Sequence, residues 1–215
     1  QTSFTTLNTP TINATASATS ITSSTATSGG TITADGGAAV TARGVVWGTT
    51  TGSSTFSATS GTGTGSYLSN LSGLTPATIY YVRAFATNSV GTVYGPETSF
   101  TSTATAPILS TIAASNITQN TASSGGTITS NGGSDITSSG ICWSTSATPT
   151  IANSKTTNGT TSGTFTSSMT GLALGTTYYV RAYATNAIGT GYGAAQSFTT
   201  LPFENVPTAA NPVTN

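Results

Sequence analysis

The stretch YYVRAFATNSVGTVYG at residues 80–95 decides the fold, because it returns almost unchanged as YYVRAYATNAIGTGYG at residues 178–193. Its first half has an apolar residue at every second position from Tyr80 to Ala86, which is the period of a β-strand with one buried face. The turn residues of NSVG or NAIG follow, and strand-forming residues resume after them. Each copy therefore predicts two strands joined by a short turn.

Other phrases recur in the same order around this stretch, which makes the chain an internal repeat. The recurring phrases are SGGTIT at 28–33 and 124–129, RGVVWGTT at 43–50 with SGICWSTS at 139–146, and ETSFTS at 97–102 with AQSFTT at 195–200. The offset between copies grows from about 96 to about 98 residues, so roughly two residues are inserted in the second copy. We place the insertion near SATPTIANS at 146–154.

The repeat predicts the domain organisation and the fold class. We predict an orphan strand at 1–6, because its sequence resembles the last strand of a module. Two modules follow at 7–103 and 104–201, and residues 202–215 are a tail or the start of a further module. In the first copy the expected strands lie near 11–18, 24–33, 40–48, 54–60, 65–71, 79–88 and 92–101. Seven strands in about 97 residues are typical of an immunoglobulin-like sandwich. The chain is therefore expected to be all-β, with two tandem seven-stranded sandwiches.

The residues around the strand at 79–88 resemble a known family. GLTPATIYYVRAFATNSVG at 73–91, with Leu74 six residues before Tyr80, resembles the corner and following strand of a fibronectin type III domain, and Leu172 and Tyr178 repeat the spacing. This resemblance implies that each Tyr hydroxyl bonds to nearby backbone, forming the tyrosine corner of sandwich folds. The implied architecture is two fibronectin III-like β-sandwiches.

A narrower resemblance rests on four phrases: GICWST, YYVRAYATN, GTGYG and SFTT. They are similar to the fibronectin-like repeats of secreted and surface proteins from Bacteroidetes-type bacteria, including large adhesins. The resemblance covers nearly all of residues 7–201, although Val45 and Val46 stand where the pattern has an aromatic residue and a Cys. It implies an extracellular structural or adhesive module that is not an enzyme.

The charge content excludes several classes of partner. Only eight side chains are charged, and they cancel: Asp35, Arg43, Arg83, Glu97, Asp135, Lys155, Arg181 and Glu204. Nucleic-acid binding requires clustered Lys and Arg, but the cations here are scattered singly. An anionic membrane surface is disfavoured for the same reason. No apolar run approaches the length of a transmembrane segment.

Candidate catalytic and metal-ligating residues are scarce. The chain has no His, which excludes Ser-His-Asp and Cys-His sites, and its four acids are too isolated for a calcium site. Cys142 aligns with Val46 and is interpreted as a small buried residue. Lys155 could form an isopeptide link, but the first copy has no Lys. We therefore expect no enzyme activity, no cofactor and no metal.

One pattern suggests an interaction surface. If Tyr80 and Val82 point inward, alternation places an outward stripe on the same strands. The stripe consists of Tyr81, Arg83 and Phe85, repeated as Tyr179, Arg181 and Tyr183. Trp47 or Trp143 on a neighbouring strand could stack on the Arg. The stripe could recognise a glycan or a neighbouring chain. Alternatively, the aromatic and Arg side chains stack within the module and stiffen the outer sheet face, or the Trp simply lies in the core.

The predicted function follows from the modules and their edges. The short link at 101–107 lacks a Gly-rich run, so we expect a semi-rigid rod that forms part of a cell-surface fibre or adhesin. Its partners would be neighbouring copies or adjacent modules. The orphan strand could add to a neighbour's sheet edge; it consists of Gln1, Thr2, Ser3, Phe4, Thr5 and Thr6. Phe203 and Val206 are candidate tail anchors. The alternative is an accessory or carbohydrate-binding module of a larger secreted enzyme.

Overall fold

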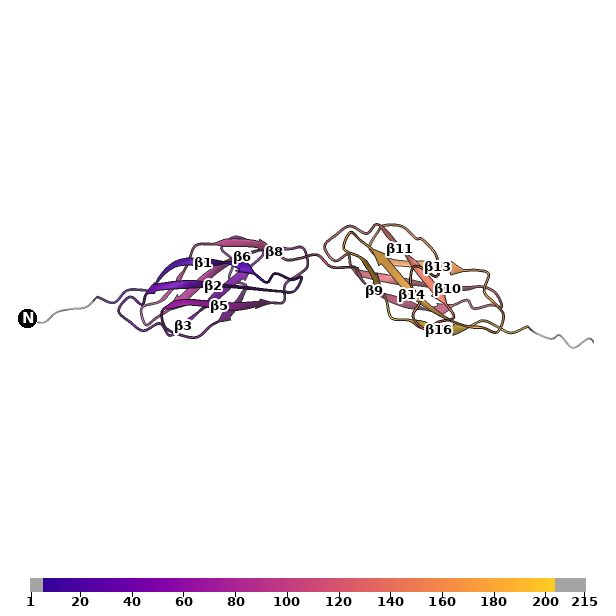
Figure 1. The fold of residues 1–215 in the computed structure, drawn as a ribbon, viewed down its shortest axis with the longest axis horizontal. Coiled ribbons are helices and arrows are strands. Elements are labelled where there is room, and N and C mark those ends of the chain that lie inside the picture. Colours follow the sequence, from indigo (N-terminus) through magenta and orange to yellow (C-terminus); the bar gives the residue numbers. More distant parts are fainter. Residues whose placement is uncertain (1–5, 204–215) are drawn as a thin grey trace, which may run out of the picture. The chain divides into compact units, whose positions relative to one another are not determined.

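The structure is a computed structural model that describes residues 6–203. These residues form sixteen β-strands and no helix, so the prediction of an all-β chain is confirmed (Figure 1). The chain divides into two compact units between Thr105 and Ala106, and the sequence placed the boundary between residues 103 and 104. Each unit is described below by itself.

Unit 1 is a sandwich of two antiparallel sheets. One sheet has the order β1-β2-β5; the other has the order β4-β3-β6-β7, with β8 also pairing with β6. The strands are β1 (Thr11–Thr19), β2 (Thr25–Ala34), β3 (Ala42–Gly48), β4 (Phe56–Thr59), β5 (Gly65–Ser72), β6 (Ile79–Thr87), β7 (Thr92–Tyr94) and β8 (Thr98–Thr101).

Unit 2 repeats this arrangement strand for strand. Its sheets have the orders β13-β10-β9 and β12-β11-β14-β15, with β16 also pairing with β14. The strands are β9 (Ile108–Ser115), β10 (Ala122–Ser130), β11 (Ser138–Ser144), β12 (Ser154–Lys155), β13 (Gly163–Met169), β14 (Thr177–Thr185), β15 (Thr190–Tyr192) and β16 (Gln196–Thr199).

Each unit has eight strands where the sequence predicted seven, because the last predicted strand is interrupted. In unit 1 the interruption lies between β7 and β8, where the Gly95 N–H donates to Ala84 O at 2.9 Å and Pro96 has no N–H to donate. Both halves still pair with β6. Unit 2 has the same break between β15 and β16, and the Gly193 N–H donates to Ala182 O at 3.0 Å.

The core of each unit lies between its two sheets. The inward residues of β6 are at most 2% exposed, which confirms the alternation inferred from the sequence. Around them a main cluster forms from Ala26, Val45, Trp47, Leu71, Leu74, Tyr80, Val82 and Phe100. The corresponding cluster of unit 2 contains Ala122, Ile141, Met169, Leu172, Val180 and Phe198.

The recurring SGGTIT phrase has a packing explanation. A Cβ on Gly30 would lie 2.6 Å from the Ala84 Cβ of the opposite sheet, and a Cβ on Gly29 would lie 1.9 Å from Tyr67 O on the neighbouring strand. Real side chains do not tolerate such distances. The paired glycines therefore allow β2 to approach both β5 and β6 closely.

Polar side chains tie the two sheets together at equivalent positions of each unit. Thr15 Oγ1 accepts the Ala84 N–H at 2.9 Å, and Thr111 Oγ1 accepts the Ala182 N–H at 3.0 Å. These bonds satisfy backbone groups that β6 and β14 would otherwise bury unpaired.

Candidate functional site

The tyrosine corner implied by the resemblance is present in both units. Tyr80 Oη accepts the Thr75 N–H at 2.9 Å, and Tyr178 Oη accepts the Ala173 N–H at 3.0 Å. Tyr80 also stacks on Phe100, with ring centroids 5.8 Å apart. These hydroxyls are occupied by backbone, so the corner is a structural feature and not a site.

The unit 1 stripe lies on the outer face of β6, where Tyr81, Arg83 and Phe85 are half-buried. The Arg83 guanidinium lies 4.7 Å from the Tyr94 ring centroid, and its Nη2 donates to Gly52 O at 2.7 Å. The expected stacking partner Trp47 is instead in the core. Trp47 lies opposite Val82 in the sheet, so it points inward with Val82.

The unit 2 stripe is more completely covered. Arg181 lies 4.5 Å from the Tyr192 ring centroid and donates from Nε to Gly193 O at 2.9 Å, while Tyr179 is half-buried. Tyr183 lies on the outer face of β14, as alternation predicts, but it is only 2% exposed because the segment after β12 covers that face. It lies over Gly140, which has no side chain, and its hydroxyl donates to Thr156 O at 2.7 Å.

The structure describes few of the predicted terminal residues. Gln1, Thr2, Ser3, Phe4, Thr5 and Val206 lie outside the described residues. Thr6 is exposed and belongs to no strand. Phe203 is 70% exposed, so it is not anchored in the described part of unit 2.

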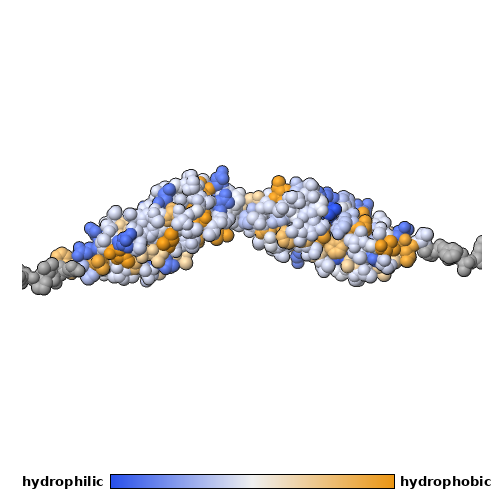
Figure 2. All heavy atoms as spheres, turned by 180° about the vertical axis from the view of Figure 1, so that it is seen from behind, coloured by the Kyte–Doolittle hydropathy of each residue, from blue (hydrophilic) through white to orange (hydrophobic). Residues whose placement is uncertain are grey.

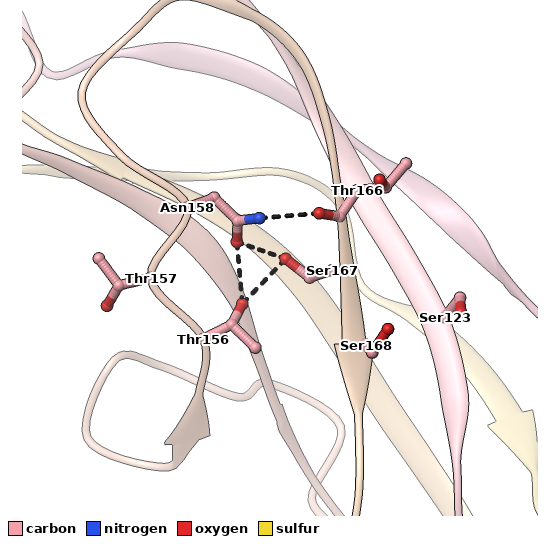
Figure 3. A pocket seen from close by; sticks show the side chains of 7 residues that line it. All are labelled: Ser123, Thr156, Thr157, Asn158, Thr166, Ser167 and Ser168. Carbon is pink, nitrogen blue, oxygen red and sulfur yellow. Dashed lines mark hydrogen bonds between the residues drawn. The ribbon is translucent and has the colours of Figure 1, made fainter.

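A hollow of about 370 Å³, lined only by hydroxyl and amide side chains, lies at one side of unit 2 (Figure 3). Asn158 Nδ2 donates to Thr166 O at 2.7 Å, and Thr156 Oγ1 donates to Asn158 Oδ1 at 3.1 Å. Ser167 Oγ donates to the same Asn158 oxygen. The network links the segment after β12 to the edge strand β13.

Unit 1 has an equivalent network, which indicates a structural role for this one. Ser60 Oγ donates to Leu68 O at 2.8 Å and pairs with Ser69 Oγ at 2.5 Å. Ser60 and Ser69 occupy the positions of Asn158 and Ser167. The sequence analysis missed these residues; the available signal was a polar residue at the Ser69 position of both copies, on the strand face that alternation assigns to the core.

The chemistry within reach of the hollow is limited to neutral hydrogen bonding. No acid, base or thiol lines it. Cys142 is fully buried elsewhere in unit 2, and burial raises the pKa of its thiol to about 11. The thiol is therefore protonated at neutral pH, whereas a nucleophilic cysteine needs a lowered pKa.

The acidic and sulfur-bearing side chains of residues 6–203 are scattered. Within this range, no three His, Cys, Asp or Glu side chains come together as a possible metal site. The same range contains no helix with the length and hydropathy that a membrane crossing requires.

Comparison with known proteins identifies the fold. The structure is similar to that of the FN1–FN3 domains of chicken CNTN1, with a TM-score of 0.50 and 13% sequence identity. The match covers 90% of this chain and 66% of that one, so this chain spans slightly less than two thirds of its neighbour. No family model matches the sequence, and no curated protein matches it. The two units are thus fibronectin type III-like sandwiches.

Proposed function

We propose that the chain is a non-catalytic extracellular structural protein whose tandem modules form part of a cell-surface fibre or adhesin. The observation that carries this proposal is the path of the chain through unit 1. Asn8 N–H donates to Gly36 O where the chain enters unit 1, and Thr103 N–H donates to Thr22 O where it leaves. Because β1 lies between these two points, the chain enters and leaves at opposite ends (Figure 1).

This path suits a module that transmits tension. A pull on the two ends loads β1 against β2 and β8 against β6, so several ladder hydrogen bonds resist together. The face in Figure 2 is mostly of intermediate hydropathy, as expected for a chain in which charged residues are 4% of the total. Bacteroidetes-type surface proteins provide the biological setting that we propose.

Single-molecule stretching tests the load-bearing role. With the chain tethered at both ends, we expect two abrupt unfolding events, each releasing about 300 Å, since roughly 90 residues at about 3.3–3.6 Å per residue unfold at once. The two events should be similar in length because the units share one topology. Smooth extension without force peaks would show that the modules do not bear load.

Terminal strand addition is the assembly step that we propose for the fibre. Residues 2–5 read TSFT, the same four residues that form β8. Both units already contain a final strand, so an added strand would extend a sheet instead of completing one. The candidate edge is β5, or β13 in unit 2, although Ser60 and Asn158 already occupy one carbonyl on each, Leu68 O and Thr166 O. Each pairs with its neighbour without a register shift and carries no charge, whereas β1 and β9 are bulged.

Removing residues 1–6 tests strand addition. The shortened chain is expected to stay folded and to remain monomeric in light scattering and electron microscopy under conditions where the full chain assembles. A matched control removes residues 204–215 and should leave assembly unchanged. Fibres that persist without residues 1–6 would refute strand addition while leaving the load-bearing role intact.

A further inference from the structure

The Trp at one repeated position has different surroundings in the two units. In unit 1, Trp47 is 4% exposed and lies opposite Phe56 of the edge strand β4. The two rings stack with centroids 5.8 Å apart and an interplanar angle of 25°. Phe56 therefore covers the indole and completes the side of the sandwich.

In unit 2 this cover is missing. Ser154 of β12 lies opposite Trp143, at the position that Phe56 occupies in unit 1. Trp143 is only partly buried, and a hollow of about 290 Å³ opens beside it. Leu172 and Tyr178 also line this hollow beside Trp143, although most of its exposed lining is polar.

The rim of the hollow is polar and neutral. Ser144, Asn153, Ser154 and Thr170 contribute hydroxyl and amide groups, and no charged residue lines the hollow. Two of these groups are held in place: Asn153 Oδ1 accepts the Thr150 N–H at 2.9 Å, and Ser144 Oγ accepts the Ser146 N–H at 3.1 Å. Ser144 Oγ also donates to Ser146 O at 3.0 Å, so it can only accept one further bond, whereas the Asn153 amide keeps its two N–H donors.

We propose that this hollow binds one pyranose ring of a neutral polysaccharide, with the apolar face of the sugar on Trp143 and its hydroxyls on the rim. A sugar ring has an apolar C–H face and hydroxyl groups around its edge. An aromatic side chain can contact the face while surrounding polar groups bond to the hydroxyls. The hollow is close to the lower size limit of ligand sites, about 300 Å³, which suits a single ring. The inference extends the adhesive part of the proposed function and is independent of load bearing.

Tryptophan fluorescence of the full chain tests the site directly. The chain has two Trp residues, so Trp47→Phe leaves Trp143 as the single reporter. Titration with cellohexaose and xylohexaose is expected to change its emission saturably for at least one of them. In the Trp47→Phe background, Ser154→Phe should place an aromatic ring against Trp143, as Phe56 does against Trp47 in unit 1. Sugar binding should then weaken at least tenfold. No emission change with either sugar, or unchanged affinity in Ser154→Phe, would overturn the proposal.

Three controls test whether the sugar binds in the hollow itself. Tyr179→Ala, on the outer face of β14, should leave the affinity unchanged; loss of binding in this variant would place the sugar on the stripe instead. Hyaluronan should not bind, because no cation lines the hollow; equal binding of this anionic polysaccharide would also refute the site. Thermal unfolding of Ser154→Phe confirms that the variant is folded, and the stretching experiment is unaffected by either result.

Discussion

Gly125→Ala is expected to destabilise unit 2 by about 3 kcal/mol, at the upper end of the range for overpacking. A Cβ at this position would lie 2.0 Å from Phe165 O and 3.0 Å from the Thr166 Cα. Both atoms belong to the backbone of β13, so no side-chain rotation relieves the contact. The strand pair β10–β13 must separate, and the seven register pairs between these strands are all affected.

Calorimetry on the full chain provides the measurement. For a domain of about 100 residues, 1 kcal/mol shifts the midpoint by roughly 4–8 °C, so the unit 2 transition should fall by at least about 12 °C. The unit 1 transition should not move. Gly189→Ala is the matched control in the same unit, because the nearest atom to its Cβ would be 4.0 Å away. Equal midpoints for the two variants would show that close strand approach does not require Gly125.

The architecture was predictable because it depends on local periodicity. Alternation from Tyr80 to Ala86 assigned the buried face of β6 correctly, and the predicted strand at 24–33 agrees with β2 (Thr25–Ala34) to within one residue at each end. The second copy of the repeat provided a second sequence from which each strand could be predicted. Where the two copies agree, as in the tyrosine corner, the sequence predicted the structure in detail.

The surroundings of the outer sheet face were not predictable from alternation. A period of two shows which face a side chain lies on, but not which loop covers that face. Arg83 bonds to Gly52 in the loop between β3 and β4, and Tyr183 bonds to Thr156 beyond β12. These contacts join residues about 30 positions apart, so no local pattern in the sequence indicates them.

The hollow beside Trp143 depends on an alignment that the sequence left approximate. Its origin is the exchange of Phe56 for Ser154, which becomes visible only when the insertion in the second copy is placed before Ser154. Strand register settles that placement, because Trp47 lies opposite Phe56 and Trp143 lies opposite Ser154. The two copies therefore differ at a position where a single side chain closes, or leaves open, the side of the sandwich.

Leu71→Ala is expected to destabilise unit 1 by about 2–5 kcal/mol, the range for removing a buried Leu side chain beyond its Cβ. Leu71 is completely buried in the main cluster of unit 1, on the inner face of β5. The expected loss combines the lost burial of apolar surface with the cavity that remains. Met169 holds the equivalent buried position in β13, so Met169→Ala should have a similar effect on unit 2 alone.

Leu68→Ala is the matched control, because it changes the same residue type on the same strand. Leu68 is 68% exposed on the outer face, so its loss should change the free energy of unfolding by no more than about 0.5 kcal/mol. Urea denaturation of both variants measures the difference. If Leu68→Ala were as costly as Leu71→Ala, the outer face of β5 would have to be covered in solution, which would point to an assembled sheet instead of a free edge.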